Sequence, residues 1–499
     1  FWLKSAVFGG RDRWPDAGDR GFMLVDCSAA LCCQDDERID KAPGSDAQLL
    51  TEMASSQEAA LSRLQAVLDS VDLGRDREQV HVQHGVTEQG DPDMVDYCIL
   101  QGLDPGAKSS LVESALCDEV LSRAMGSVCG MAVGDALGHP FEFIAATDDP
   151  GTAFFDLETK EFNCEFNKFR LERGQWTDDA AMGLCMADSL IMRRSYDGGD
   201  MRVRFWCWWF RGYNNAFRRD EERPSKRSIG LGGNVASSLA ELSRLEGDEL
   251  GRVPCVPDVY EAPSEDSGNG SLMRLAPVAV FFCTAPSTEL HRIASLSSWT
   301  THPGVYASEA CAVLAHLIAS AITRPVDDKA DARSFLDRAI EEYVVESGLQ
   351  GKRGPGYDEM RSLLASAPRR PEEGCWDWRS EQLCVESSLR ARGLMYNGYP
   401  VCSDYFGSYS IDGLAVALWA VYNTASFDEA VVKSVNVHGD ADSHGSITGQ
   451  IAGAFYGYSQ INRTFLDWLR RWDDNETAVR ALLLYHLGRE AQGKGRARE

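Results

Sequence analysis

A glycine stands at every fourth position of the segment Gly126-Ser127-Val128-Cys129-Gly130-Met131-Ala132-Val133-Gly134-Asp135-Ala136-Leu137-Gly138. A second ladder of the same period lies far along the chain, at Gly445, Gly449, Gly453 and Gly457. Glycine inside a helix costs about 1 kcal/mol relative to alanine, so four in register need a reason. This spacing puts them on one helical face, where the missing Cβ lets another backbone approach closely. The ladders therefore predict two central, tightly packed helices. The two helices are candidates to pack against each other.

Helices that pair inside membranes show the same spacing, but that interpretation fails here. Asp135 lies in the first ladder and Gln450 in the second, and neither segment is long enough to span a bilayer. The sequence shows no run of about 18 apolar residues, which predicts a protein without a membrane span. The net charge of −26 argues against nucleic acid and anionic membranes as partners.

Outward from the ladders, apolar residues recur at three- and four-residue spacing, which is typical of amphipathic helices. Helices are predicted at 178–195, 234–246, 287–299, 304–322, 331–346, 412–423, 444–460 and 475–487. Alternating, strand-like runs are scarce. We therefore predict an all-α fold, with one compact multi-helix domain over residues 111–490.

Two flanking segments differ from this domain. Residues 1–110 form a predicted N-terminal extension of unknown role, with a helical pattern near 55–71, and residues 491–499 form a polar tail. Within the domain, the stretch from Pro368 to Trp378 is predicted to be a surface excursion. The charged stretch 218–227 is typical of a solvated loop, with a rim facing the substrate as the alternative.

The 15 cysteines are scattered and form no CxxC pair, so a thiolate zinc site is not expected. Cysteines among apolar neighbours are typical of buried thiols in a reducing compartment. We therefore predict an intracellular, cytoplasmic location.

Oxygen-bearing side chains gather in three short motifs. They are Thr177-Asp178-Asp179, Asp440-Ala441-Asp442-Ser443, and Asp135 with Glu142. Helix capping explains each motif singly, because hydroxyl and acidic residues favour helix starts. Together they exceed what capping requires. Several carboxylates with neighbouring hydroxyls suit a hard divalent cation, and the lack of histidine or cysteine in the Thr-Asp-Asp motif favours Mg²⁺ or Mn²⁺ over Zn²⁺. There are enough carboxylates for two ions.

Three further segments suit a phosphate-bearing ligand. They are Ser228-Ile229-Gly230-Leu231-Gly232-Gly233-Asn234, Ser267-Gly268-Asn269-Gly270-Ser271-Leu272-Met273-Arg274 and Thr301-His302-Pro303. Glycines let backbone N–H groups approach a phosphate, and a following helix adds its dipole. Each segment alone also fits an ordinary turn or a structural histidine.

Taken in order, these segments resemble the ADP-ribosylglycohydrolase family, which includes the dinitrogenase-reductase-activating glycohydrolases. The resemblance covers about residues 120–460 and rests on Gly134–Gly138 with Glu142, Gln175–Asp179, Gly268–Arg274, Thr301–Pro303 and Gly439–Ser443. It implies an all-α fold, a centre of two Mg²⁺ or Mn²⁺ ions, and hydrolysis of the glycosidic bond at the distal ribose of ADP-ribose. The implied partner is an ADP-ribosylated protein or a small ADP-ribose derivative.

Site residues carry over from this resemblance motif by motif. The implied metal ligands are Thr177, Asp178, Asp179, Asp440, Asp442 and Ser443. The implied catalytic carboxylates are Glu142, Asp178, Asp179 and Asp442. The implied ADP-ribose contacts are Gly230, Gly232, Gly233, Asn234, Gly268, Asn269, Gly270, Ser271, Met273 and His302.

The sequence departs from the family pattern at three positions. Ala180 and Ser443 stand where threonine is common, and His438 stands where a glycine usually precedes Gly-Asp. The bulk of His438 predicts an altered substrate choice. Residues 1–110 have no counterpart in the family core.

Two alternatives to a hydrolase of ADP-ribosyl linkages remain open. One is an inactive ADP-ribose-binding or crystallin-like structural relative, and the other is a metal-dependent phosphohydrolase. The sequence does not decide among arginine, serine and O-acetyl linkages.

Overall fold

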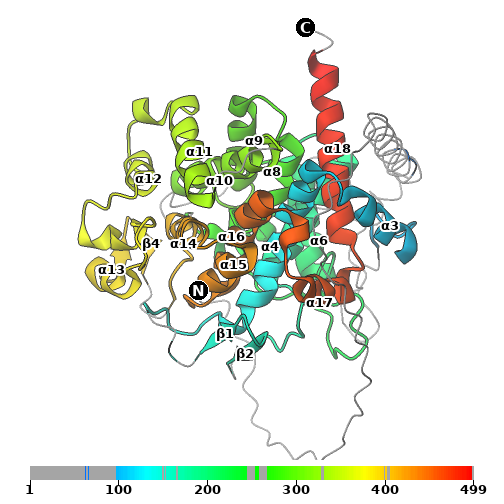
Figure 1. Cartoon of the computed structure of the whole chain (residues 1–499), viewed down its shortest axis with the longest axis horizontal. Coiled ribbons are helices and arrows are strands. Elements are labelled where there is room, and N and C mark those ends of the chain that lie inside the picture. The colour runs from blue at the N-terminus through cyan, green and yellow to red at the C-terminus, as the bar shows by residue number, and fades with distance from the viewer. Residues whose placement is uncertain are drawn as a thin grey trace, which may run out of the picture.

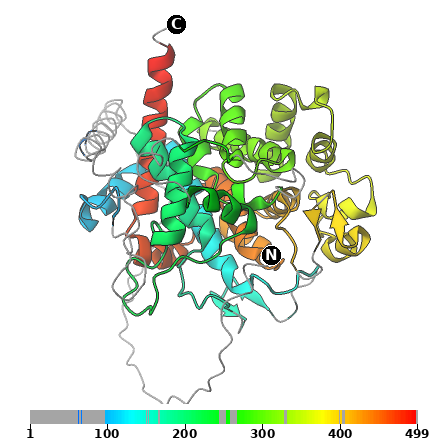
Figure 2. The same cartoon turned by 180° about the vertical axis from the view of Figure 1, so that it is seen from behind.

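The computed structural model describes residues 97–148, 151, 153–164, 167–243, 253–257, 267–326, 331–397, 399–401 and 405–496, together with Ser62 and Ala66. Apart from those two positions, the predicted helical segment near 55–71 lies outside the described residues. Helices make up most of the described chain and strands very little of it (Figures 1 and 2), so the predicted all-α fold is confirmed.

The α-helices are α3 (Pro105–Ala115), α4 (Glu119–Gly138), α5 (Asp178–Arg193), α6 (Gly198–Arg211), α7 (Gly233–Leu242), α8 (Ala276–Phe282), α9 (Ser287–Trp299), α10 (Val305–Thr323), α11 (Ala332–Glu346), α12 (Tyr357–Leu364), α13 (Val385–Arg392), α14 (Ser410–Tyr422), α15 (Phe427–Val435), α16 (Ala441–Tyr456), α17 (Arg463–Asp473) and α18 (Glu476–Arg496). The short 3₁₀ helices are η1 (His139–Phe141), η3 (Asn269–Ser271), η4 (Leu349–Gly351), η5 (Pro371–Trp376) and η6 (Tyr458–Gln460). The described residues also form two small antiparallel hairpins, β1 (Phe154–Asp156) with β2 (Glu161–Asn163) and β3 (Met395–Tyr396) with β4 (Tyr399–Pro400).

The glycine ladders of α4 and α16 face each other in antiparallel fashion at the centre of the molecule (Figure 1). The facing pairs are Gly126 and Gly453, Gly130 and Gly449, Gly134 and Gly445, and Gly138 and Ala441. A Cβ built on Gly134 would lie 1.9 Å from the carbonyl oxygen of Gly445. The two backbones are therefore in direct contact, and each ladder is the partner of the other. The predicted close packing of both helices is confirmed.

Helix α10 lies in the core beside α8, α9, α14 and α16. By length and composition alone it could cross a membrane, and it is the one such helix among the described residues. The expectation that the sequence holds no such stretch is therefore wrong. In the fold, 89% of its apolar window is buried inside the protein, which explains why this helix is so apolar; Glu309 and His316 are its buried exceptions.

The stretch from Pro368 to Trp378 is a surface excursion only in its first half: residues 368–371 are exposed, but the prediction is wrong for the second half, which is largely buried. The indole rings of Trp376 and Trp378 are fully buried, and their N–H groups donate to Asp412 at 2.8 Å and to the carbonyl of Leu363 at 2.7 Å. Arginines, glutamates and prolines around them made the segment look solvated. Two tryptophans outweigh that composition, because each buries a large apolar area.

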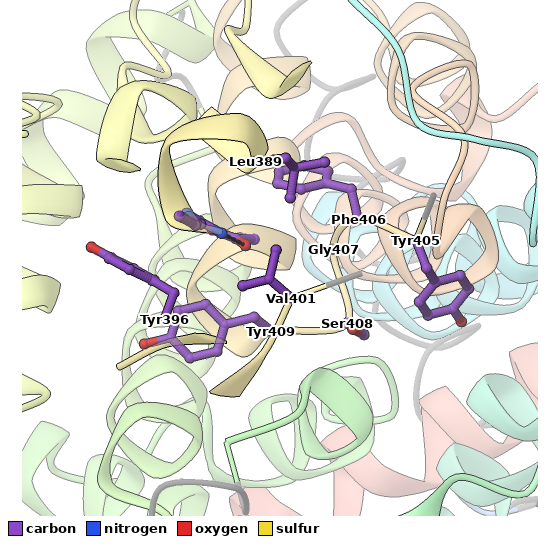
Figure 3. A pocket seen from close by; sticks show the side chains of 10 residues that line it. Leu389, Tyr396, Val401, Tyr405, Phe406, Gly407, Ser408 and Tyr409 are labelled. Atoms are coloured by element: carbon purple, nitrogen blue, oxygen red, sulfur yellow. Dashed lines mark hydrogen bonds and ion pairs between the residues drawn. The ribbon is translucent and has the colours of Figure 1, made fainter. Parts of the chain in front are cut away.

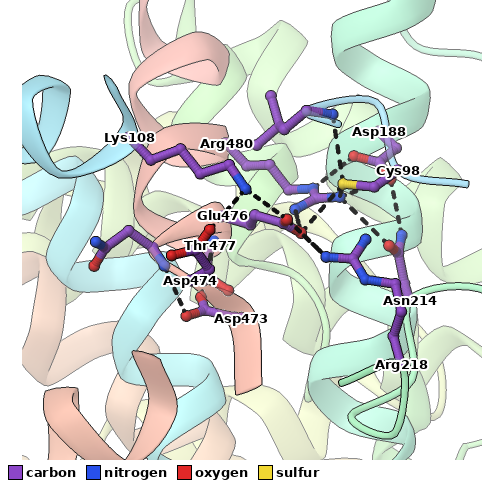
Figure 4. Close-up of polar contacts among 12 residues, drawn as sticks. Cys98, Lys108, Asp188, Asn214, Arg218, Asp473, Asp474, Glu476, Thr477 and Arg480 are labelled. Carbon is purple, nitrogen blue, oxygen red and sulfur yellow. Dashed lines mark hydrogen bonds and ion pairs between the residues drawn. The ribbon is translucent and has the colours of Figure 1, made fainter. Parts of the chain in front are cut away.

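Residues 97–110, which belong to the predicted extension, pack onto α18 through a buried polar network (Figure 4). The ammonium group of Lys108 contacts Glu476 at 2.9 Å, and the thiol of Cys98 donates to the same carboxylate at 3.1 Å. Arg218 approaches Glu476 at 2.6 Å. The charged stretch 218–227 therefore begins with an arginine bound in a structural cluster. At the other end, α18 continues through Arg496, into the predicted tail.

Candidate metal and ligand site

Three helix ends meet at one end of the α4–α16 contact. Helix α4 carries Asp135 in its last turn and leads through η1 to Glu142. Helix α16 starts beside it with Asp440 at its N-cap and Asp442 in its first turn. Helix α5 contributes Asp178 and Asp179 in its first turn. All five site carboxylates (Glu142, Asp178, Asp179, Asp440 and Asp442) are buried.

Asp135 joins α4 to the start of α5. Its carboxylate accepts hydrogen bonds from the backbone N–H groups of Thr177 and Ala180, both at 2.9 Å, and from the Thr177 hydroxyl at 2.9 Å. Thr177 occupies the N-cap position, but its own side chain does not cap the helix. Asp135, which lies 42 positions earlier in the chain, thus caps α5 in place of the Thr177 side chain. The hydroxyl of Thr177 faces other carboxylates of the site instead.

The hydroxyl of Thr177 lies among three carboxylates. Besides Asp135, it approaches Asp179 Oδ2 at 3.2 Å and Asp442 Oδ2 at 3.5 Å. A hydroxyl has one hydrogen to donate. Donation to Asp135 leaves its oxygen facing two further oxygens. A cation between such oxygens would stabilise this arrangement.

A second set of oxygens surrounds Asp440. Carboxylate oxygens of Glu142, Asp440 and Asp442 all lie within 4.8 Å of one another. The Tyr405 hydroxyl donates to Asp440 Oδ1 at 2.6 Å and lies 3.0 Å from Glu142 Oε1. The hydroxyl of Ser443 lies 3.3 Å from Asp440 Oδ1.

Tyr405 is the site residue that the sequence motifs do not reveal. It precedes α14 in a segment without helical periodicity, so no pattern marks it. Its ring stacks on Phe143 at 5.3 Å between ring centroids, and burial and the nearby carboxylates raise the pKa of its hydroxyl well above the ordinary value. Tyr405 therefore stays protonated and remains a hydrogen-bond donor to the carboxylates.

The crowding of carboxylates shows in their proton affinity. Burial raises the pKa of Asp135 to about 7, even though hydrogen bonds from the start of α5 act in the opposite direction. Burial raises the pKa of Asp179 well above its ordinary value, and repulsion from Asp135, Asp178, Asp440 and Glu142 adds to it. Oδ1 of Asp179 is buried and has no hydrogen-bond partner among the described residues.

These side chains fit hard divalent cations. The donors are carboxylate and hydroxyl oxygens, which Mg²⁺ and Mn²⁺ prefer. The charge of a cation would offset the repulsion that raises the pKa of Asp179. The neighbouring His444 is also buried, but burial lowers its pKa to about 4 and it belongs to neither oxygen set.

The loop before α7 lies against Asp178. Gly230 has φ +90°, and a Cβ at this position would lie 1.8 Å from Asp178 Oδ1. Only glycine therefore permits this approach of the loop to the carboxylate. Gly232 and Gly233 face open space, since no atom lies within 4 Å of a Cβ built on either. Asn234 follows in the first turn of α7.

The 3₁₀ turn η3 lies against the ring of His302. Cβ atoms built on Gly268 and Gly270 would lie 3.3 and 3.0 Å from His302 Nε2. The Thr301 hydroxyl accepts from Arg274 at 2.6 Å and lies 2.7 Å from His302 Nδ1. In the tautomer in which Nδ1 accepts from Thr301, Nε2 carries the ring hydrogen and can donate it toward this turn. Burial, together with Arg274, lowers the pKa of His302 well below its ordinary value, so the ring is neutral.

The other side chains of the Gly268–Arg274 segment are used within the protein. Asn269 donates to Asp440 Oδ2 at 2.8 Å, which ties the turn to the carboxylates. The Ser271 hydroxyl forms a hydrogen bond with the Ser298 hydroxyl at 2.8 Å, so this side chain is used within the protein. The sulfur of Met273 accepts from the Ser443 hydroxyl at 3.7 Å.

The bulk of His438 lies beside backbone carbonyls on the β1 side of the site. Its ring nitrogens contact the carbonyls of Ala145 at 3.3 Å and Ala153 at 2.7 Å, and its ring stacks on Phe141 at 5.8 Å. Its φ of +66° is the left-handed conformation that glycine adopts most easily. Histidine therefore accepts some backbone strain here and gains contacts to the segment that follows η1.

Residues 405–409 line a pocket together with Tyr396 (Figure 3). Figure 3 shows Tyr405 at one end of the pocket lining, away from Tyr396 and Tyr409. Arg392 and Asp412 also line it, and they form a buried ion pair with Arg392 Nη1 2.5 Å from Asp412 Oδ2. The segment thus presents one tyrosine to the carboxylates and another to this pocket.

The helical fold and the oxygen-only ligand set define a class of protein: an all-α domain built around a candidate divalent-metal site. The ADP-ribosylglycohydrolase family profile matches residues 116–493, and the chain belongs to this family.

Named relatives agree with this assignment. ADP-ribosylarginine hydrolase Tri1 of Serratia proteamaculans is 26% identical over 354 residues, which cover 70% of this chain and 76% of that protein. ADP-ribosyl-[dinitrogen reductase] glycohydrolase of Rhodospirillum rubrum is 25% identical, covering 71% and 91%. Human ADP-ribosylhydrolase ARH3 is 21% identical, covering 72% and 93%. A solved structure of an ADP-ribosylglycohydrolase-related protein complex matches with a TM-score of 0.50 and 26% identity, covering 74% of this chain and 99% of that one.

Proposed function

We propose that this protein is a divalent-metal-dependent hydrolase that cleaves the glycosidic bond between ADP-ribose and an acceptor, with ADP-ribosylated arginine as the preferred acceptor. The observation that carries the proposal is the meeting of five buried carboxylates from three helix ends, with 300 positions between the first and last. The acceptor rests on the Serratia relative and a second ADP-ribosylarginine hydrolase from Pseudomonas putida, 27% identical over 370 residues.

Two Mg²⁺ or Mn²⁺ ions would be held by Thr177, Asp178, Asp179, Asp440, Asp442 and Ser443. Such ions, when bound, polarise a water and orient the hydroxyls of the substrate. The chain fixes these groups before any ligand arrives, because Asp135 holds Thr177 and Asn269 holds Asp440. Asp135 lies on α4 and Asp440 lies at the start of α16, so the close contact of these two helices keeps the ligand oxygens in place.

The carboxylates also supply the proton transfers. Asp178, Asp179 or Asp442 accepts a proton from the attacking water, whose oxygen bonds to the anomeric carbon as the bond to the acceptor breaks. The acceptor leaves with a proton, and Glu142 is the candidate donor because it lies beside the Tyr405 hydroxyl at the edge of the oxygen set. The transition state resembles an oxocarbenium ion, which a cluster of carboxylates stabilises by its charge.

Recognition of ADP-ribose is assigned to the two glycine-rich loops and His302. The protein is strongly acidic, so an anionic diphosphate needs local donors. Backbone N–H groups around Gly232–Asn234 and Gly268–Ser271, with His302 Nε2, provide them. The unpaired state of every described cysteine supports a reducing, cytoplasmic setting for this activity.

The test is release of ADP-ribose from three substrates: ADP-ribosylated arginine, ADP-ribosylated serine and O-acetyl-ADP-ribose. Each is incubated with the full chain in Mg²⁺ or in EDTA, and the products are identified by mass spectrometry. We expect Mg²⁺-dependent release, fastest from arginine. Asp442→Asn should abolish release, and the exposed Asp467→Asn serves as the matched control.

Binding of ADP-ribose without release from any substrate would refute the hydrolase and favour an inactive binding protein. Release that is undiminished in EDTA would refute the metal requirement. Faster release from serine or O-acetyl than from arginine would refute the proposed acceptor alone.

A further inference from the structure

Two buried histidines and a glutamate converge at the junction of α9, α10 and α11. His291 Nε2 lies 3.0 Å from His316 Nδ1, and Glu346 Oε2 lies 3.9 Å from the same His316 nitrogen. One ligand-type atom from each residue lies within 4.8 Å of the other two. The histidine side chains are buried, whereas Glu346 is 44% exposed. The cluster thus has a fixed inner part and a carboxylate that reaches it from solvent.

The two imidazole rings are held in place by an aromatic residue that is itself fixed. The ring of Tyr343 packs edge-on against His291 at 4.9 Å and against His316 at 5.5 Å between centroids. The Tyr343 hydroxyl donates to Glu309 at 2.7 Å, and Lys352 contacts the same carboxylate at 2.8 Å. Supporting hydrogen bonds and packing of this kind orient metal-binding side chains.

We propose that His291, His316 and Glu346 form a zinc site, separate from the site of the five buried carboxylates. Two imidazoles and one carboxylate with an open fourth position for water form a common ligand set of Zn²⁺. The carboxylate site is different in kind, since it offers only oxygens and suits harder ions. None of its carboxylates lies on α9, α10 or α11.

The observed distances need little adjustment to accept the ion. Zinc–nitrogen bonds of about 2.0–2.1 Å at a tetrahedral angle place two nitrogens about 3.3 Å apart. The histidine nitrogens are at 3.0 Å, so the rings would separate by a few tenths of an ångström. Glu346 lies at the surface end of α11 and can close the remaining gap by a side-chain rotation.

The rings are also in the charge state that zinc requires. Burial lowers the pKa of His291 to about 4 and lowers the pKa of His316, so both are neutral near pH 7. Without zinc, one of the two facing nitrogens carries the hydrogen of the bond between the rings. That ring must move its hydrogen to its other nitrogen before both facing nitrogens can offer a lone pair. Zinc would replace that single bond with three and join three helices.

The site is tested by titrating Zn²⁺ into the full chain by calorimetry in excess Mg²⁺, and by following Co²⁺ absorption as a probe of nitrogen and oxygen ligation. We expect a Zn²⁺ equivalent that is lost in His316→Gln and weakened about tenfold or more in Glu346→Gln. Glu346 is exposed, so its variant keeps the fold even where the histidine variant does not. Glu341→Gln is the matched control, because Glu341 is exposed on the same helix and points about 140° away.

Zn²⁺ should raise the melting temperature of the parent protein and of Glu341→Gln, but should have a smaller effect on Glu346→Gln. Absence of Zn²⁺ binding would overturn the proposal. Zn²⁺ binding of equal affinity in parent and Glu346→Gln, or a Co²⁺ spectrum dominated by thiolate, would also overturn it, since the ion would then sit elsewhere. These outcomes do not depend on hydrolase activity.

Discussion

Replacing Gly134 by alanine should separate the two central helices. A Cβ there would lie 1.9 Å from the carbonyl oxygen of Gly445 and 2.2 Å from its carbonyl carbon. Real Cβ atoms do not approach other atoms closer than about 3.0 Å, so the backbones must part by at least about 1 Å. No rotamer change relieves a contact with backbone, and overpacking of this kind costs about 1–3 kcal/mol.

The opposing effect is smaller. Alanine is favoured over glycine in a helix by about 1 kcal/mol. The clash falls at the upper end of its range, so the net loss in free energy of unfolding is about 2 kcal/mol. Unfolding entropy of about 2.1 cal/mol/K per residue converts this into a fall in melting temperature of about 2–3 °C for a domain of this size.

The matched control is Gly493→Ala, an exposed helical position in α18 with no atom within 4 Å of a new Cβ. This variant gains the higher helix propensity of alanine and has no steric clash, so its melting temperature should stay level or rise. Thermal unfolding of both variants, followed by circular dichroism, checks the difference. A Gly134→Ala protein as stable as the parent would show that the helices are not in backbone contact.

Further predictions concern the site. Asp442→Asn should abolish turnover and the rise of melting temperature with Mg²⁺ while leaving the metal-free protein folded, because it relieves carboxylate repulsion; differential scanning fluorimetry with and without Mg²⁺ checks this. The pKa of Asp135, raised from 3.8 to about 7, means that the folded state binds more protons between these values. In EDTA, stability should therefore fall as pH rises through this window, and Mg²⁺ should reduce the fall. A melting temperature in EDTA that stays constant or rises with pH over this window would contradict the prediction. His302→Ala should weaken ADP-ribose binding by about 1–3 kcal/mol without altering the Mg²⁺ response, measured by calorimetry, and unchanged affinity would remove its role as a donor. Tyr405→Phe should weaken Mg²⁺ binding by about 10–100-fold, and equal affinity in both proteins would contradict its role in holding Asp440.

The features predicted from sequence are those written in short local patterns. Stacked glycines at a helical period require a close backbone neighbour, and the structure supplies one. The Thr-Asp-Asp and Asp-Ala-Asp-Ser motifs each lie within four residues, so they could be found without knowing the fold.

The features that were missed depend on distant contacts. Asp135 caps α5 from another helix, and Tyr405 reaches the site from a segment with no periodicity. The burial of Trp376 and Trp378 was hidden by polar neighbours in sequence. Helix α10 is strongly apolar because most of it is buried inside the protein, which composition alone does not distinguish from a membrane span.

The glycine ladders alone do not explain which register α4 and α16 adopt. Sliding one helix by four residues, about 6 Å, would place Gly138 opposite Gly445 and would again pair glycine with glycine along the contact. In the observed register Gly138 meets Ala441, beside Asp442.

Two features favour the observed register. Gly457 has φ +87° and lies just beyond α16, so it cannot serve as a helical partner for Gly126 after a slide. The Ser127 hydroxyl also donates to the carbonyl of Gln450 at 3.1 Å, a bond that a slide would break. A slide would also displace Asp442 by about 6 Å along α4 and so change the set of oxygens that it now forms with Glu142. Bound cations would need that set of oxygens, so the metal site and the register of the central helices should stabilise each other.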